Sequence, residues 1–201
     1  MSVFWPFDFS ILNYLQTVRT DFFDFFFSTV THLADKGIFW ILAGLVLVCF
    51  AKTRKTGGTT LLALVFSVIV CNILLKNIVA RPRPYTIEEW SIIKDAANEL
   101  LVGLPDDWSF PSGHTSASFA AATAIFCCNK KWGIASYVLA VLIAFSRIYL
   151  YVHYPTDVIA AVIIGIAVGI AAYFIVDAVF RSKKFGPLCN RLCTPKAKKQ
   201  N

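Results

Sequence analysis

The chain has 201 residues, of which 57% are hydrophobic and 15% are charged. Soluble domains average about 45–50% apolar residues, glycine included, and about 25% charged residues, so a soluble domain, a disordered chain, a collagen and a disulfide-stapled miniprotein are excluded. The formal net charge is +7, but the basic residues lie between apolar runs. The excess therefore indicates membrane topology and no nucleic-acid partner.

The hydropathy pattern predicts one all-α domain, residues 1–201, with six transmembrane helices. A span needs roughly 20 apolar residues. The first predicted span in chain order, at about Phe9–Ala34, is rich in Phe but also carries charged residues. We therefore expect it to be either one span or an interfacial helix followed by a short crossing. We expect no cleaved signal peptide. Five stretches contain no Asp, Glu, Lys or Arg: Gly37–Ala51, Thr56–Leu75, Trp108–Asn129, Trp132–Ser146 and Val158–Val176.

The connections between spans predict the orientation. With six spans, twelve of the 19 Lys and Arg residues fall on one side, and the positive-inside rule makes that side cytoplasmic. The N-terminus and a basic tail, residues 181–201, are then also cytoplasmic. The long connection Arg81–Phe110 faces outward, and we expect a short amphipathic helix within it. The twelve residues are Lys52, Arg54, Lys55, Lys130, Lys131, Arg181, Lys183, Lys184, Arg191, Lys196, Lys198 and Lys199.

A second set of ionisable residues lies at the outer ends of spans 3 to 6. Such groups are costly near a bilayer and are usually paired or functional. Because four span ends place these residues at the same membrane depth, we expect the residues to form one shared site. The residues are Lys76 and Arg83 in KNIVARPRP, Ser112 and His114 in FPSGHTSAS, and Arg147, His153 and Asp157 in SRIYLYVHYPTD.

The residue types at these ends favour an oxyanion. The prolines of RPRP disfavour helix in the residues before them, so span 3 should unwind near Ala80 and present Arg83 on a turn. Ser112 is a good N-cap and Gly113 permits close backbone approach, so the start of span 4 offers free N–H groups and a positive dipole end. Together with the other two cations, these groups suit a phosphoryl transition state and remove the need for a metal.

The histidines suit covalent catalysis. His153 and Asp157 are four residues apart, so the carboxylate can orient one imidazole nitrogen and leave the other free as a nucleophile. His114 lies on another span and is then available as the general acid for the leaving oxygen. The pattern predicts phosphoryl transfer through a phosphohistidine.

The three motifs resemble the signature of the type-2 phosphatidic acid phosphatase superfamily, which is K-x6-R-P, P-S-G-H and S-R-x5-H-x3-D. The resemblance implies a membrane lipid phosphatase without metal or other cofactor, whose site lies at the extracytoplasmic ends of spans 3 to 6. It implies that His153 is the nucleophile, that Asp157 orients it, and that His114 protonates the leaving group and then activates water. It also implies that the phosphate is held by Lys76, Arg83, Ser112, Gly113 and Arg147.

Some residues near the motifs have less defined roles. Arg81-Pro82 is a second Arg-Pro pair; the spacing selects Arg83 and leaves Arg81 as an auxiliary contact to a headgroup or diphosphate. The segment 106–108, Asp-Asp-Trp, precedes the Pro-Ser-Gly-His turn and is expected to shape the entrance. His32 matches no motif and is interpreted as structural.

The exact function stays open between several hypotheses. The favoured substrate is undecaprenyl diphosphate, because a short chain with an outward site suits carrier-lipid recycling in a bacterial plasma membrane; phosphatidylglycerol phosphate and phosphatidic acid are the alternatives. Vanadium haloperoxidases share the motifs, but six spans argue against them. An anion transporter should show paired broken spans and repeated halves. A serine hydrolase built on Ser112, His153 and Asp157 would leave the three cations without a role.

Overall fold

The structure is a computed structural model that describes residues 5–93, 100–103 and 105–194. Within these residues the chain is helical and contains no β-strand. A π-helical segment, Val68–Leu75, joins α4 to α5, and 3-10 turns lie at Asp35–Gly37 and Pro84–Thr86. The α-helices are α1 Trp5–Thr17, α2 Asp21–Leu33, α3 Ile38–Cys49, α4 Arg54–Ser67, α5 Lys76–Val79, α7 Gly113–Cys128, α8 Lys130–Tyr149, α9 Pro155–Arg181 and α10 Gly186–Cys193.

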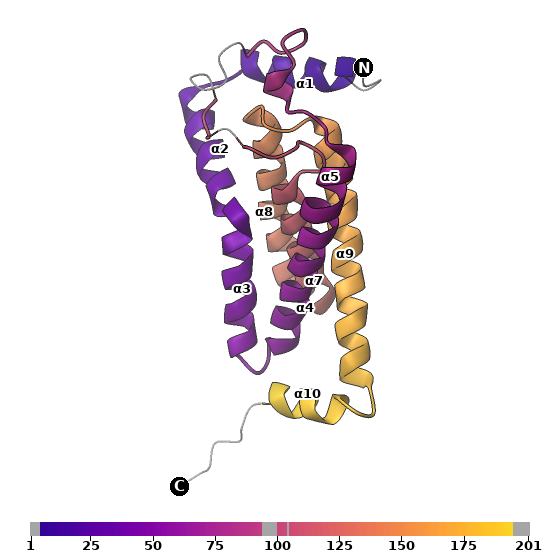
Figure 1. The fold of residues 1–201 in the computed structure, drawn as a ribbon. Helices are drawn as coiled ribbons and strands as arrows, with labels where there is room; N and C mark the ends of the chain where they lie inside the picture. The colour runs from indigo at the N-terminus through magenta and orange to yellow at the C-terminus, as the bar shows by residue number, and fades with distance from the viewer. Residues whose placement is uncertain (1–4, 94–99, 104, 195–201) are drawn as a thin grey trace.

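The helices form an elongated bundle (Figure 1). The column made by α2 and α3, the column made by α4 and α5, and the helices α7, α8 and α9 run along its length. Helix α1 lies across one end of the bundle and α10 lies across the other. The two ends of the described chain therefore lie at opposite ends of the molecule.

Helix α7 is the centre of the bundle and packs against α4, α8 and α9. Four of its alanines are completely buried: Ala120, Ala121, Ala122 and Ala124. Helix α9 approaches it through Gly165 and Gly169: a Cβ atom at Gly165 would lie 2.7 Å from the carbonyl oxygen of Ser116. Small residues four positions apart allow helix backbones to approach closely in lipid. This tight packing fixes the start of α7, which carries the Pro-Ser-Gly-His motif.

The outer surface of the bundle is apolar. Phe22, Phe25 and Ile163 are 70%, 73% and 64% exposed, as expected for side chains that face lipid tails rather than water. Helix α7 has 16 residues, fewer than α8 with 20 and α9 with 27. Within the described residues, four candidate spans are long and apolar enough to cross a membrane: Asp21–Cys49, Arg54–Thr86, Lys130–Tyr149 and Pro155–Arg181.

The structure differs from the six spans expected from the sequence. The sequence assigns residues 9–34 and 37–51 to two spans of opposite direction, whereas α2 and α3 continue in one direction along a single column (Figure 1). Asp21–Cys49 is accordingly one candidate span. Helix α1 lies across the end of the bundle instead of entering it, so the interfacial alternative for the first segment is the one that the structure supports.

The two ends of the bundle differ in charge. Helices α4 and α8 begin, and α9 ends, at the α10 end (Figure 1), and described basic residues gather there. The prediction that the N-terminal and C-terminal segments share one side is wrong, because α1 and α10 lie at opposite ends. The basic residues at the α10 end include Arg54, Lys55, Lys130, Lys131 and Arg181.

Two further sequence expectations concern connecting segments. The described parts of the connection Arg81–Phe110 contain no α-helix. Residues 94–99 of the expected amphipathic helix, and residues 195–201 of the basic tail, lie outside the described residues.

Candidate active site

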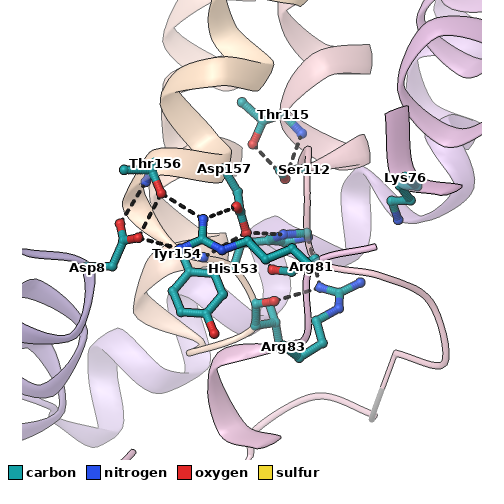
Figure 2. Close-up of polar contacts among 12 residues, drawn as sticks. Asp8, Lys76, Arg81, Arg83, Ser112, Thr115, His153, Tyr154, Thr156 and Asp157 are labelled. Carbon is teal, nitrogen blue, oxygen red and sulfur yellow. Dashed lines mark hydrogen bonds and ion pairs between the residues drawn. The ribbon is translucent and has the colours of Figure 1, made fainter. Parts of the chain in front are cut away.

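The motif residues converge at the end of the bundle that α1 covers (Figures 1 and 2). A cavity of about 520 Å³ opens there. It is bounded by side chains from the helix columns and from the connections that follow α5 and α8. Of the residues predicted from the sequence, those that line it are Lys76, Arg83, Gly113, His114, Arg147 and His153.

The chain unwinds after α5, as the prolines predict. Helix α5 ends at Val79, and Ala80 adopts the left-handed conformation with φ of 45°. Arg83 is extended, with φ of −73° and ψ of 151°, directly before Pro84, and it is only 5% exposed. Its Nη1 donates a 2.6 Å hydrogen bond to the carbonyl oxygen of Val152. The turn thus aims Arg83 at the segment that carries His153.

The connection between α8 and α9 positions His153. Arg147 lies in the last turn of α8, and its carbonyl oxygen accepts the backbone N–H groups of Val152 and His153, each at 3.3 Å. Helix α9 begins at Pro155. Because Asp157 lies in the first turn of α9, its Oδ2 also accepts the backbone N–H of Tyr154, at 3.1 Å. Local backbone geometry therefore fixes both members of the His–Asp pair.

The contacts of His153 identify the nitrogen that is free to react. Its Nε2 lies 3.0 Å from Nη1 of Arg83. A guanidinium can only donate, so Nε2 accepts and the proton resides on Nδ1. Nδ1 lies 3.6 Å from Oδ2 of Asp157 and is buried without a hydrogen-bond partner in the described structure. The predicted pair therefore forms at ion-pair distance, longer than a hydrogen bond.

Burial and the neighbouring cations keep His153 uncharged. Burial first, and then the positive charges of Arg83 and Arg147, lower the pKa of His153 well below its usual value. The imidazole is only 1% exposed. A neutral ring that carries its lone pair on Nε2 is the form that a nucleophile requires, and the hydrogen bond from Arg83 must be released before that lone pair can attack.

Asp157 lies behind His153 rather than in the cavity, within a buried polar network (Figure 2). Its Oδ1 accepts a 2.6 Å hydrogen bond from Nη1 of Arg81, and its Oδ2 accepts one from the hydroxyl of Ser109. Nη2 of Arg81 donates at 2.6 Å to Asp8 of α1, which is fully buried and also accepts the backbone N–H of Thr156 at 3.0 Å. Arg81 does not line the cavity, so the structure does not bring it to the auxiliary position expected from the sequence; it binds Asp157 instead.

Ser112 is placed as an N-cap rather than as a phosphate ligand. It is fully buried, accepts the backbone N–H of Thr115 at 3.5 Å and the hydroxyl of Thr115 at 3.0 Å, and is not among the residues that line the cavity. Gly113 does line it, and a Cβ atom there would lie 2.8 Å from Oδ1 of Asn72. The first turn of α7 therefore offers backbone N–H groups, and the serine-hydrolase alternative lacks an accessible nucleophile.

Arg147 lines the cavity and has unused hydrogen-bonding capacity. It is 4% exposed, and its Nη1 donates a 2.6 Å hydrogen bond to the hydroxyl of Thr31. Its Nε is buried without a partner in the described residues. Buried donors are nearly always satisfied, so an unsatisfied guanidinium edge beside two other cations indicates a place for an anion.

The carboxylate of Asp107 lies between two of these cations. Its carboxylate contacts Nζ of Lys76 and Nη2 of Arg83. Burial alone would raise the pKa of the Asp107 carboxyl, but its hydrogen bond from Lys76 and the charges of Lys76 and Arg83 outweigh burial and lower that pKa. Asp106 and Asp107 line the cavity, as the entrance prediction requires, whereas Trp108 does not.

His114 faces the same cavity from the start of α7. Its Nε2 lies 3.0 Å from Oδ1 of Asp35, an acid to which the sequence assigned no role. Among the described residues, no group of three or more His, Cys, Asp or Glu side chains is arranged to hold a metal ion.

Comparison with known proteins places this arrangement in a family. The model of the PAP2 superfamily matches residues 57–181, a range that contains all three motifs.

The chain belongs to the PAP2 superfamily.

Relatives of this PAP2 protein agree with the family assignment. Undecaprenyl-diphosphatase of Sulfolobus acidocaldarius is 30% identical over 158 residues, which are 78% of this chain and 71% of that protein. Lipid A 4'-phosphatase of Bacteroides thetaiotaomicron is 27% identical over 183 residues, which are 84% of this chain and 76% of that protein. The crystal structure of the transmembrane PAP2-type phosphatidylglycerolphosphate phosphatase of Bacillus subtilis shares the fold, with a TM-score of 0.71 at 23% identity over 91% of this chain and 90% of that one.

The family, the apolar bundle and the relatives together define the class of this PAP2 protein. It is a membrane protein with transmembrane helices and an enzyme of the lipid-phosphatase type. Its cavity combines a neutral imidazole, a second imidazole and three cations, which is the set of groups that metal-free phosphoryl transfer requires.

Proposed function

We propose that this PAP2 protein hydrolyses a lipid phosphate or diphosphate through a phosphohistidine at His153, without a metal. One observation carries the proposal: groups from separate parts of the chain line one cavity and suit one small tetrahedral anion. Cations bind the oxygens of the anion, one imidazole attacks it, and the other handles the leaving group. These groups are Lys76, Arg83, Arg147, His153 and His114.

In the first step, the Nε2 lone pair of His153 attacks phosphorus and the bond from phosphorus to the lipid oxygen breaks. His114 gives its proton to that oxygen, so the lipid leaves as an alcohol or as a lipid phosphate. The three cations bind the non-bridging oxygens, and Asp107 moves away from Lys76 and Arg83 to admit them. The proton on Nδ1 of His153 faces Asp157, 3.6 Å away, so the carboxylate stabilises the charge that the ring acquires.

In the second step, His114 is neutral and accepts a proton from water. The oxygen of that water attacks phosphorus, the bond from phosphorus to Nε2 breaks, and inorganic phosphate is released. His153 returns to its neutral state and His114 is protonated again for the next cycle.

The cavity supports a lipid substrate that enters from the bilayer. Ile41 of α3 and Val68, which follows α4, line the cavity. They are also 40% and 46% exposed, which supports entry of the substrate from lipid on the side of α3 and α4. A phosphate headgroup can then reach the cations while its tail stays in the membrane.

The charge distribution supports an outward site. The basic residues gather at the α10 end, which the positive-inside rule makes cytoplasmic, and the cavity lies at the other end (Figure 1). We therefore place the reaction at the outer leaflet of the cell membrane. The relative in Sulfolobus supports undecaprenyl diphosphate as the preferred substrate; phosphatidylglycerol phosphate and phosphatidic acid are the alternatives.

Phosphate release from purified protein tests both levels of the proposal. In detergent with EDTA, the protein should release inorganic phosphate from lipid phosphates, fastest from undecaprenyl diphosphate. His153→Ala should lower kcat on the order of 10³-fold or more, because no other group replaces the nucleophile. Asp21→Asn, an exposed change at the start of α2, is the control with unchanged activity. Activity retained by His153→Ala would refute the nucleophile, and faster release from phosphatidylglycerol phosphate would refute the preferred substrate.

A further inference from the structure

The column made by α2 and α3 is interrupted at the level of the cavity. Helix α2 ends at Leu33, α3 begins at Ile38, and the 3-10 turn Asp35–Gly37 lies between them. Lys36 and Gly37 both have positive φ, 52° and 69°, which is unfavourable for a lysine. Just beyond the turn, the buried indole of Trp40 donates a 2.9 Å hydrogen bond to Ser118 of α7. The interruption is therefore fixed against α7.

This turn places one carboxylate between two imidazoles. Oδ1 of Asp35 lies 3.0 Å from Nε2 of His114, and Oδ2 of Asp35 lies 2.8 Å from Nδ1 of His32. All three residues line the cavity. The site thus has a second His–carboxylate contact besides the pair formed by His153 and Asp157, and this one lies in the cavity and involves the histidine proposed to act on the leaving group.

The surrounding charges give this contact a function. A proton donor must carry its proton before the reaction, but the cations Lys76 and Arg147, which line the same cavity, disfavour a charged imidazole. Asp35 opposes these cations and the cost of burial in part, because an ionised carboxylate accepts the Nε2–H of His114 and favours the protonated ring. With Nε2 bound to Asp35, Nδ1 is the nitrogen left to donate a proton to the leaving oxygen.

We infer that Asp35 is a positioning residue for the proton donor, held in place by His32; the inference rests on the proposed phosphatase reaction. When the bond from phosphorus to the leaving oxygen breaks, the Nδ1–H bond of His114 breaks and an O–H bond forms on that oxygen. The ring stays bound to Asp35 through Nε2–H. In the second step Nδ1 takes the proton of the attacking water. His32, assigned to a structural role from the sequence, acts here through Asp35.

Leaving groups of different quality test the inference. An alkyl phosphate such as dioctanoyl phosphatidic acid needs a proton donor for its leaving oxygen, whereas p-nitrophenyl phosphate expels a stable phenolate and needs little help. We expect Asp35→Asn to lower kcat/KM for the alkyl phosphate about 100-fold and for the aryl phosphate only about threefold, within the range of general-acid effects. The ratio kcat/KM is used because it reports the steps up to the first phosphate transfer.

Two comparisons separate a positioning role from a structural one. In a His114→Ala background, Asp35→Asn should cause no further loss, because the two residues act as a unit. Asp21→Asn, on the same column and away from the cavity, is the matched control. Equal losses on both esters, or a full additional loss in the His114→Ala background, would overturn the inference. If His153→Ala loses all activity but Asp35→Asn lowers kcat/KM equally for both esters, the proposed function stands and the inference about Asp35 is wrong.

A second variant tests the inference if Asp35→Asn does not fold. His32→Gln changes an exposed side chain and loosens the carboxylate without removing it. It should lower kcat/KM for the alkyl phosphate about threefold, a loss typical of one hydrogen bond, and leave the aryl phosphate unchanged. The same loss on both esters would contradict the role of Asp35.

Discussion

At the scale of single residues, the surroundings of His153 suit the role of nucleophile that we propose for it. The side chain is enclosed between Arg83, which donates to Nε2, and Asp157, which faces Nδ1. The cation lowers the affinity of the ring for protons and selects the nitrogen that carries the lone pair. In the proposed reaction the same guanidinium binds the phosphate after Asp107 has moved away, so one residue would both prepare the nucleophile and bind its target.

The protonation state of His153 can be measured directly. The chain has three histidines, so nitrogen NMR of histidine-labelled protein in detergent gives few signals, which His32→Gln and His114→Gln assign. Because burial, Arg83 and Arg147 lower its pKa, His153 should stay neutral as the pH falls through about 6.5, the usual imidazole value, with the proton on Nδ1. A ring that protonates near that value, or carries its proton on Nε2, would contradict the contacts described.

Asp107 makes a second prediction, about anion affinity. Its carboxylate contacts Lys76 and Arg83, and its lowered pKa keeps it charged at neutral pH, where it competes with phosphate. Asp107→Asn should therefore strengthen competitive inhibition by inorganic phosphate about fivefold, the effect of roughly 1 kcal/mol for a partly exposed ion pair. Glu89→Gln, an exposed change in the same connection, should leave the inhibition constant unchanged. Weaker inhibition of Asp107→Asn would show that the carboxylate supports phosphate binding instead.

At the scale of helices, α1 contributes to the site through a single acid. Asp8 is fully buried, and it binds both Arg81 and the first turn of α9. Arg81 in turn binds Asp157. An interfacial helix is therefore connected to the His–Asp pair through one guanidinium.

Asp8→Asn should weaken this connection. The substitution leaves the buried guanidinium of Arg81 with one carboxylate partner fewer. Breaking a buried ion pair lowers the free energy of unfolding by roughly 3 kcal/mol, so the thermal unfolding midpoint in detergent should fall. The rate constant kcat should fall more than KM rises, because Asp157 loses its fixed position while the cavity keeps its cations. Ser10→Ala, an exposed change on α1, is the control. An unchanged midpoint would mean that α1 does not depend on the buried acid.

The sequence predicted those helix ends that have a strong local signal. The prolines after Ala80 and the N-cap at Ser112 each favour one backbone geometry, and the structure shows it. The residues of the turn Asp35–Gly37 do not predict whether the chain continues in one direction or reverses there. The same residue types occur in an interruption within a helical column and in a loop between two spans.

The missed site residues have a different cause. Asp8, Asp35 and Ser109 belong to no motif, and their contacts join residues 73, 79 and 48 positions apart in the chain. Such pairings depend on how the helices are arranged, which local sequence patterns do not encode. The one available signal was that an acid within an apolar segment is costly and therefore functional or paired.

At the scale of the whole molecule, the side of the membrane on which α1 lies depends on whether the column made by α2 and α3 crosses the membrane once or twice. If α2 and α3 together cross once, α1 lies on the same side as the cavity and α10 lies on the other (Figure 1). With two crossings in the same stretch, α1 would lie on the side of α10. The position of α1 therefore distinguishes the observed arrangement from the six-span arrangement expected from the sequence.

Labelling of single cysteines in intact cells tests this topology. In a background without the six native cysteines, Ser10→Cys on α1 and Lys131→Cys at the start of α8 both alter exposed positions. A membrane-impermeant maleimide should label Ser10→Cys and not Lys131→Cys, and permeabilised cells, in which both react, are the control. Labelling of both positions only after permeabilisation would restore two crossings between α1 and α4. Labelling of Lys131→Cys alone in intact cells would turn the cavity toward the cytoplasm, because the site and α8's start lie at opposite ends of the bundle.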